Sequence, residues 1–261
     1  MDLGLRGHRA LITGGSRGIG FAIADALAAE GAAVGLVARD PGGLADAAVR
    51  LAPRGVPVAT AAADVLDPAA LHRAVDGIAA ELGGLDHLVA NAGGTVGTGN
   101  LTSAGPGEFT ETFALNAGHA AELIRAGLGH LRAAGGGSVV IISSITGLRP
   151  APRTAYAAAK AAEIQLAATA AQELAPDRIR VNAVSPGSIL FPGGSWDTFR
   201  RENPVDFATF LETQFPFGRL GRLEEVADVA TFLLSKRASW VTGSNFVVDG
   251  GQRYPSARRF T

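Results

Sequence analysis

Short apolar runs alternate with stretches whose apolar residues recur at helical spacing, and this alternation begins almost at the first residue. The runs are continuous in Val, Ile, Leu and Ala, which is typical of strands that are buried on both faces of a sheet. They predict strands at Arg9–Thr13, Ala33–Val37, Val56–Ala62, Leu85–Ala90, Ser138–Ser143, Arg180–Val184 and Asn245–Val248. The amphipathic stretches predict helices at Gly18–Glu30, Gly42–Leu51, Pro68–Leu82, Phe109–Arg132, Ala155–Leu174 and Leu223–Leu234.

Strands that are joined by single helices run parallel and are connected by right-handed crossovers. The pattern therefore predicts an α/β fold, a single doubly wound, Rossmann-type domain of about seven parallel strands with helices on both faces. No linker, repeat or low-complexity stretch divides the chain. We expect residues 1–261 to form one catalytic domain.

One segment, Ser188–Phe217, departs from this rhythm, because it is too long for an ordinary connection between the sixth strand and the last helix. Loops of that length in compact domains are usually lids or binding elements. The segment is rich in aromatic residues, which are Phe191, Trp196, Phe199, Phe207, Phe210, Phe215 and Phe217. The spacing of Trp196 and Phe199 predicts a helical cover over a substrate pocket. Simple packing of these rings on the domain is the alternative.

Composition narrows the class of protein. Hydrophobic residues make up 47% of the chain and the formal net charge is −1, which indicates a folded core and gives no support to a nucleic-acid surface. No apolar run reaches the roughly 18–20 residues that cross a bilayer, and the first residues do not resemble a signal peptide. The chain has no cysteine, and its five histidines lack metal-ligand spacing. We expect a cytoplasmic protein without a metal site or a membrane partner.

The first strand leads directly into Thr13-Gly14-Gly15-Ser16-Arg17-Gly18-Ile19-Gly20 and then into a helix. Glycines let the backbone turn sharply and approach a pyrophosphate, whose charge is favoured at the helix N-terminus. The same residues also satisfy G-x-S-x-G, the nucleophile elbow of α/β-hydrolases. That reading needs a histidine late in the chain, whereas the last one is His130. The turn is therefore interpreted as a dinucleotide-binding turn.

A second group of residues points to proton chemistry. Tyr156 and Lys160 are four positions apart, so on a helix the phenol and the ammonium project from one face. Ser143 and Ser144 come at the end of the preceding strand, and Asn116 belongs to the helix before it. Taken alone, the tyrosine and lysine would be an ordinary exposed helical pair.

Together, these residues resemble the short-chain dehydrogenase/reductase family, and the match extends along nearly the whole chain. The matching motifs are Thr13–Gly20, Asp64, Asn91-Ala92-Gly93, Asn116, Ser144, Tyr156 with Lys160, Asn182, Pro186-Gly187 and Asp249-Gly250-Gly251. The stretch that begins Phe217-Gly218-Arg219-Leu220-Gly221 makes the pattern most similar to bacterial 3-oxoacyl-carrier-protein reductases.

The resemblance implies four catalytic residues. Tyr156 would exchange a proton with the substrate oxygen, and Lys160 would lower the pKa of that phenol, ordinarily about 10, and hold the nicotinamide ribose. Ser144 would donate a hydrogen bond to the substrate oxygen, and Asn116 would position a water of a proton relay behind Lys160. Ser144 is one residue closer to Tyr156 than is usual in the family, so Ser143 remains the alternative.

The resemblance also implies a cofactor site. Its residues are Gly14, Ser16, Arg17, Gly18, Ile19, Gly20, Arg39, Asp64, Val65, Asn91, Ala92, Gly93, Tyr156, Lys160, Pro186, Gly187 and Ile189. Asp64 would contact the adenine, Asn91-Ala92-Gly93 would lie beside the adenosine ribose, and Pro186, Gly187 and Ile189 would lie against the carboxamide. Asn91 could equally hold neighbouring strands together. Phe191 stands where the family usually has a threonine.

The end of the second strand distinguishes the two nicotinamide cofactors. An NAD site normally has Asp or Glu there to bind the ribose 2′-hydroxyl, whereas this strand ends Val37-Ala38-Arg39-Asp40. Arg39 and Arg17 suit a 2′-phosphate through charge-assisted hydrogen bonds. The sequence therefore favours NADP(H), and Asp40 keeps NAD(H) as the less favoured choice.

These observations predict an oxidoreductase that transfers a hydride between NADP(H) and a carbonyl or secondary alcohol. We expect a ketone reductase that acts on a largely apolar small molecule, with acyl-carrier, steroid, polyketide-like and sugar carbonyls as candidates. The alternative is a nucleotide-binding regulatory protein on the same fold without turnover. By resemblance, the helices at Phe109–Arg132 and Ala155–Leu174 would form a homo-oligomer, a tetramer or a dimer.

Overall fold

A sheet of seven parallel strands forms the centre of the protein, in the order β3-β2-β1-β4-β5-β6-β7. The computed structural model describes residues 2–257. The strands are β1 (Arg9–Thr13), β2 (Ala33–Ala38), β3 (Val58–Ala62), β4 (His87–Ala90), β5 (Gly137–Ile142), β6 (Ile179–Pro186) and β7 (Asn245–Val248). The order reverses between β1 and β4, and crevices for ligands form at such a point, outside the carboxyl ends of the strands. The predicted fold class is confirmed.

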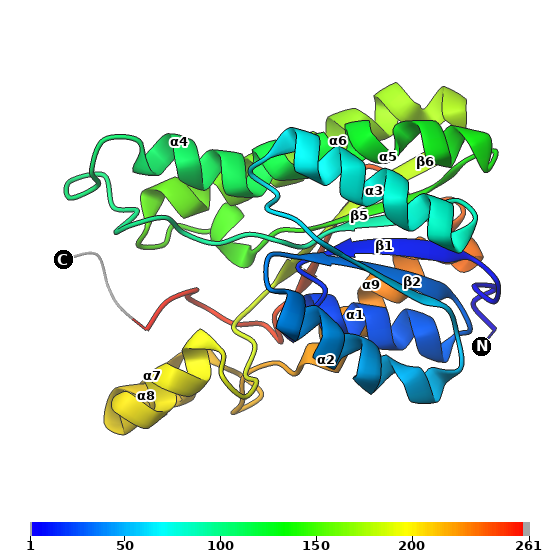
Figure 1. Ribbon diagram of the computed structural model, residues 1–261. Helices are drawn as coiled ribbons and strands as arrows, with labels where there is room; N and C mark the ends of the chain where they lie inside the picture. The colour runs from blue at the N-terminus through cyan, green and yellow to red at the C-terminus, as the bar shows by residue number, and fades with distance from the viewer. Residues whose placement is uncertain (1, 258–261) are drawn as a thin grey trace.

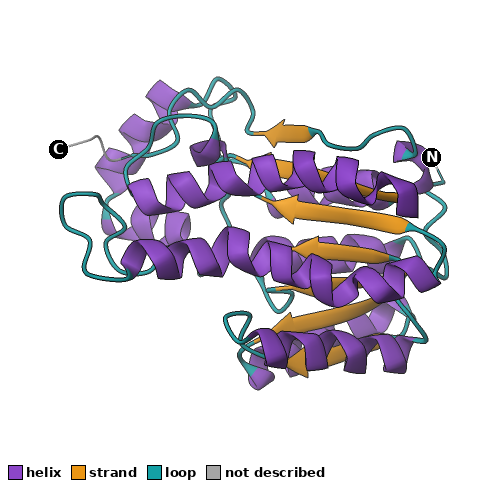
Figure 2. Ribbon diagram, turned by 90° about the horizontal axis from the view of Figure 1, so that it is seen from above, coloured by secondary structure: helices purple, strands orange, loops and turns teal. Residues whose placement is uncertain are grey.

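Helices cover both faces of this sheet (Figures 1 and 2). One layer contains α3 (Pro68–Leu82), α5 (His119–Ala133) and α6 (Thr154–Leu174), and the other contains α1 (Gly18–Ala29), α2 (Pro41–Leu51) and α9 (Leu223–Leu234). Successive strand residues point to opposite faces, so Leu11 packs in the core beneath the first layer and Ile12 in the core beneath the second. This explains why the strands read as continuous apolar runs.

The expected helix at Phe109–Arg132 is interrupted. It consists of α4 (Glu108–Phe113), a π-helical turn (Ala114–Gly118) and α5. The side chain of Asn116 donates to the carbonyl oxygen of Thr112 at 2.6 Å, which is the acceptor that an α-helix assigns to the backbone N–H of the same residue. This competition accounts for the wider turn, and it fixes Asn116 at the break.

The aromatic-rich segment contains two helices, α7 (Ser195–Glu202) and α8 (Pro204–Gln214), which stand apart from the two helical layers (Figure 1). They have a small core of their own, built from Phe210, Phe215 and Leu220 with Trp196 packed against it. The Trp196 and Phe210 rings stack with centroids 4.8 Å apart. The segment is thus a helical pair held together mainly by its own aromatic residues.

No helix within residues 2–257 combines the length and the hydrophobicity that a membrane span requires.

Candidate active site

A cavity of about 600 Å³ opens at the carboxyl ends of the central strands. Ser144 and Tyr156 line it from the sheet side, Gly187 lies after β6, and Trp196 and Phe199 line it from α7. The structure therefore brings the candidate catalytic hydroxyl groups and the aromatic segment to one space. Trp196 and Phe199 both face this cavity and pack on each other, with ring centroids 5.8 Å apart.

The two adjacent serines have different surroundings. Ser143 is buried, and its hydroxyl donates to the backbone carbonyl of Lys160 at 2.7 Å. Ser144 lines the cavity, and its hydroxyl accepts a hydrogen bond from the backbone N–H of Thr146 at 3.2 Å. That contact leaves the Ser144 proton available to a substrate oxygen, whereas Ser143 ties β5 to α6. The geometry favours Ser144.

Tyr156 and Lys160 lie on successive turns at the beginning of α6. Tyr156 lines the cavity, and the Lys160 ammonium lies behind it, 5.5 Å from the centroid of the phenol ring. The i, i+4 spacing explains this arrangement, because it places both side chains on the helix face that meets the end of β5.

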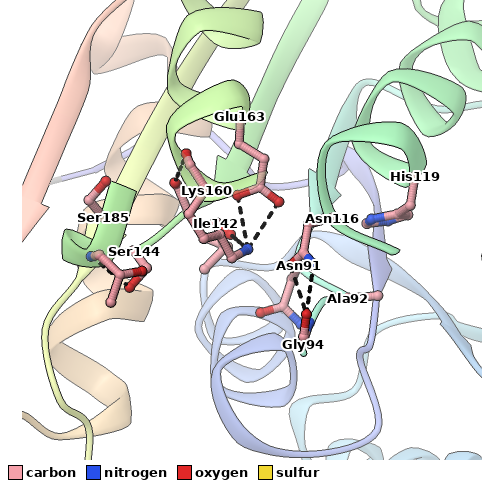
Figure 3. A network of polar contacts seen from close by, with 12 residues as sticks. Asn91, Ala92, Gly94, Asn116, His119, Ile142, Ser144, Lys160, Glu163 and Ser185 are labelled. Atoms are coloured by element: carbon pink, nitrogen blue, oxygen red, sulfur yellow. Dashed lines mark hydrogen bonds and ion pairs between the residues drawn. The ribbon is translucent and has the colours of Figure 1, made fainter. Parts of the chain in front are cut away.

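Glu163, whose role no sequence motif indicated, contacts Lys160 in the interior. The Lys160 Nζ donates to both carboxylate oxygens of Glu163, at 2.9 and 3.0 Å, and to the carbonyl oxygen of Ile142 at 3.0 Å (Figure 3). Burial lowers the pKa of Lys160, but the Glu163 carboxylate and, to a smaller extent, the Tyr156 phenol outweigh it, and the resulting pKa lies above the ordinary value. Burial also raises the pKa of Glu163 against the pull of the ammonium.

The buried side chain of Asn116 forms all its hydrogen bonds in the described structure with backbone groups. Its amide donates to Gly94 and Thr112 carbonyl oxygens, and its oxygen accepts from the Gly94 N–H at 3.2 Å. A Cβ added at Gly93 would come within 2.6 Å of the Asn116 oxygen and 3.3 Å of the Lys160 nitrogen. The side chains of Asn116 and Lys160 therefore both approach the space that a side chain at position 93 would need.

The glycine-rich turn, Thr13–Gly20, is held rigidly between β1 and α1. Gly14 has a φ of 65°, and a Cβ at Gly20 would collide with the Gly14 carbonyl. The Asn91 amide donates to the carbonyl oxygens of Thr13 and Gly14 at 3.0 and 3.2 Å. Asn91 thus has the structural role that its sequence left open.

The remaining predicted cofactor residues lie just after strands of the sheet. The turn between β1 and α1 is completed by Ser16, Arg17, Gly18 and Ile19. After β4, the Ala92 N–H donates to the Thr13 hydroxyl at 3.3 Å. Asp64 and Val65 come after β3, the first exposed and the second buried.

At the end of β6, Pro186 is the last strand residue and Ile189 is buried. A Cβ at Gly187 would come within 2.9 Å of the Asp249 backbone, so this position also requires glycine. Phe191 lies against the glycine-rich turn, since a Cβ at Gly18 would meet its ring at 3.3 Å.

Two arginines and one aspartate lie at the positions from which the sequence predicted the cofactor preference. Arg17, the N-cap residue of α1, and Arg39, directly after β2, are exposed and have no carboxylate partner within the described part of the chain. Asp40 is the N-cap of α2, and its carboxylate accepts from the Gly42 and Gly43 N–H groups at 3.0 and 3.1 Å. The carboxylate that would favour NAD is therefore used by the helix.

Fold and site together define an α/β protein with a glycine-rich turn after β1 and a cavity lined by Ser144 and Tyr156, with the Lys160 ammonium behind the phenol. The family model described as Enoyl-(Acyl carrier protein) reductase matches residues 14–253. Isoepoxydon dehydrogenase patN of Penicillium expansum is 35% identical over 257 residues, which cover 96% of each chain. The protein therefore belongs to the short-chain dehydrogenase/reductase family.

Solved structures agree with this assignment. L-Sorbose reductase from Gluconobacter frateurii, in complex with NADPH and L-sorbose, is 35% identical with a TM-score of 0.89, and the match covers 97% of this chain and 98% of that one. A 7α-hydroxysteroid dehydrogenase, in complex with NADH and 7-oxo glycochenodeoxycholic acid, is 29% identical with a TM-score of 0.90 and 98% of each chain covered. These two neighbours hold different nicotinamide cofactors and different second ligands in their complexes.

Proposed function

We propose that this protein is an NADP(H)-dependent reductase of a largely apolar ketone, working in reverse on the secondary alcohol. The observation that carries the proposal is the common cavity of Ser144 and Tyr156 with the Lys160 ammonium behind the phenol. Bound nicotinamide would supply the hydride. The protein has to orient the carbonyl, provide its proton and exclude water.

Ser144 and Tyr156 would share the first two of these tasks. The Ser144 hydroxyl donates to the carbonyl oxygen and stabilises the charge that develops on it. Tyr156 gives its proton to the same oxygen in reduction and takes it back in oxidation. The Lys160 ammonium, 5.5 Å from the ring centroid, would stabilise the negative charge that the phenol oxygen carries when its proton has left. The Glu163 carboxylate reduces this effect.

The choice of NADP(H) rests on Arg17 and Arg39. Both are exposed at the strand ends where the adenosine ribose binds in dinucleotide folds, and guanidinium groups form bidentate bonds with phosphate. Asp40 caps α2, which removes the main argument for NAD(H). The phosphate turn at Gly14, Ser16, Gly18, Ile19 and Gly20 fits a pyrophosphate at the α1 N-terminus.

The apolar substrate is inferred from the walls of the cavity. Trp196 and Phe199 line it from α7, and closure of residues 188–217 over a bound ketone would keep water from the hydride path. A regulatory protein without turnover is not favoured, because Asn116, Ser144, Tyr156 and Lys160 are all present. Assembly through α5 and α6 into a dimer or tetramer, a single functional domain and a cytoplasmic location stay predictions.

A panel of ketones, followed by NADPH absorbance, tests the proposal. It should include cyclic, long-chain and sugar ketones, with NADH in parallel and with Tyr156→Phe as the matched control. We expect turnover of apolar ketones with NADPH and none with the variant. Absence of turnover with every ketone and both cofactors, in protein that binds NADPH, would favour the regulatory alternative.

A further inference from the structure

The Lys160 ammonium has no N–H group left for another partner. Its nitrogen lies 2.9 and 3.0 Å from the two Glu163 oxygens and 3.0 Å from the Ile142 carbonyl oxygen. An ammonium has three N–H donors, so these acceptors use all of them. Figure 3 shows the amine turned toward Glu163, and Lys160 is absent from the cavity lining.

The Lys160–Glu163 pair is sealed from water, with exposed fractions of 3% and 1%. Glu163 is the one carboxylate that contacts Lys160 within residues 2–257. The other titratable groups that face the pair are Tyr156 on the same helix and His119 on α5. Burial, and then the charge of Lys160, lower the pKa of His119 to about 4, so this ring is neutral.

Neutral groups complete the surroundings. Ser143 at the end of β5 faces Glu163, and Asn116 on the π-helical turn lies near the lysine amine beneath Gly93. Ser143, Asn116 and the neutral His119 ring carry no charge that could balance a buried ammonium, and Tyr156 contributes less to the Lys160 pKa than Glu163 does. An ion without a partner in such a place tends to lose its charge, so the charge of Lys160 depends on Glu163.

We propose that Glu163 is a positioning residue: it keeps Lys160 charged and fixed behind Tyr156 before any cofactor is bound. The inference rests on the proposed function, because it concerns the lysine assigned there to the phenol and the ribose. A carboxylate can release one of its two hydrogen bonds and keep the other. Lys160 can therefore turn one N–H group toward a ribose hydroxyl while its charge remains compensated.

Replacement of the carboxylate separates this role from simple packing. Glu163→Gln keeps the size and one acceptor oxygen but removes the charge, so the buried lysine should release its proton more readily. Glu163→Asp retains the charge on a side chain one methylene shorter. If Glu163 only filled space, the two variants would leave the protonation of Lys160 unchanged.

The chain suits a direct measurement, because Lys160 and Lys236 are its only lysines. Lysine labelled with ¹³C at Cε gives two signals in the cofactor-free protein, and the exposed Lys236 serves as the reference. In the wild type, we expect more than half of Lys160 to remain protonated at pH 10.5, which is the ordinary pKa of a lysine side chain. In Glu163→Gln, the midpoint should fall by more than about one pH unit, a tenfold change in the acid constant, and in Glu163→Asp by less.

A wild-type midpoint below the ordinary value would overturn the proposal without any variant, and so would equal midpoints in wild type and Glu163→Gln. A second readout is NADPH affinity, measured in a Tyr156→Phe background so that the phenol does not titrate. From one pH unit below to one pH unit above the measured Lys160 midpoint of the Glu163→Gln variant, NADPH affinity of that variant should fall at least about fivefold, and with Glu163 present it should change at most about twofold over the same pH range; equal pH dependence would contradict the proposal. Since the lysine titration needs neither cofactor nor substrate, it is independent of the ketone panel.

Discussion

Trp196 offers the sharpest test of how the α7–α8 pair contributes to function. Its ring lines the cavity and also stacks on Phe210 in the small core of the pair, outside the two cores of the sheet. Removal of a fully buried aromatic ring costs about 3–5 kcal/mol. Because Trp196 is only half-buried, we expect Trp196→Ala to cost about 2 kcal/mol, and to weaken the helical pair more than the sheet.

The same substitution removes one apolar wall of the cavity. A loss of about 1.4 kcal/mol of contact with an apolar ketone corresponds to a tenfold rise in KM. We therefore expect KM to rise about tenfold. Because most of the lost stability falls on the separately packed helical pair and at most about 1 kcal/mol on the sheet, the main melting transition should shift by less than about 3 °C. Phe199→Ala, which leaves the Phe210 core intact, should raise KM with a smaller effect on the helical pair.

Two measurements on the same preparation, KM from initial rates and Tm from calorimetry, distinguish a role of Trp196 in substrate binding from a role in the fold. The matched control is Trp240→Ala, because Trp240 is the only other tryptophan and is 98% exposed. Neither quantity should change in the control. A large fall in the main Tm with an unaltered KM would show that Trp196 serves the fold and that the cover over the substrate is a wrong interpretation.

Three further substitutions test separate parts of the site and the fold. Tyr156→Phe should lower kcat by far more than tenfold with NADPH affinity nearly intact, whereas an activation barrier raised by less than about 1.4 kcal/mol would refute the proton-transfer role. Arg39→Ala should weaken NADPH by about 1.5–3 kcal/mol and barely affect NADH; equal losses in titrations with both cofactors would assign Arg39 to the fold. The pKa of Glu225 is lowered to about 2, chiefly by a hydrogen bond from Arg219. Its ion pair therefore contributes fully to the free energy of unfolding above the ordinary pKa of 4.5, and this contribution disappears as the pH falls toward 2. Glu225→Gln should therefore lower the free energy of unfolding at neutral pH by at most about 1 kcal/mol, because the pair is partly exposed, and the denaturation curves of the two proteins should converge near pH 2.

The architecture was predictable because strands buried on both faces are apolar at every position, and those stretches agree with the observed strands to within about two residues. The break in the helix at Asn116 was not predictable, because it depends on the Asn116 side chain competing with the backbone N–H of the same residue for the Thr112 carbonyl. Glu163 was missed for a related reason. An acidic residue three positions after a lysine usually forms a solvated helical pair, and only the packing of α6 against the sheet makes this one buried.

The separate core of α7 and α8 has a consequence for how the protein can change over evolution. Residues that share no packing contact affect stability almost additively, so substitutions inside the Phe210–Phe215–Leu220 cluster should leave the sheet and its cofactor turn undisturbed. New pocket shapes could then arise by exchange of this helical pair alone. Proteins with this fold could then come to bind different substrates through changes in the helical pair, while the residues on the sheet that take part in hydride transfer stay the same.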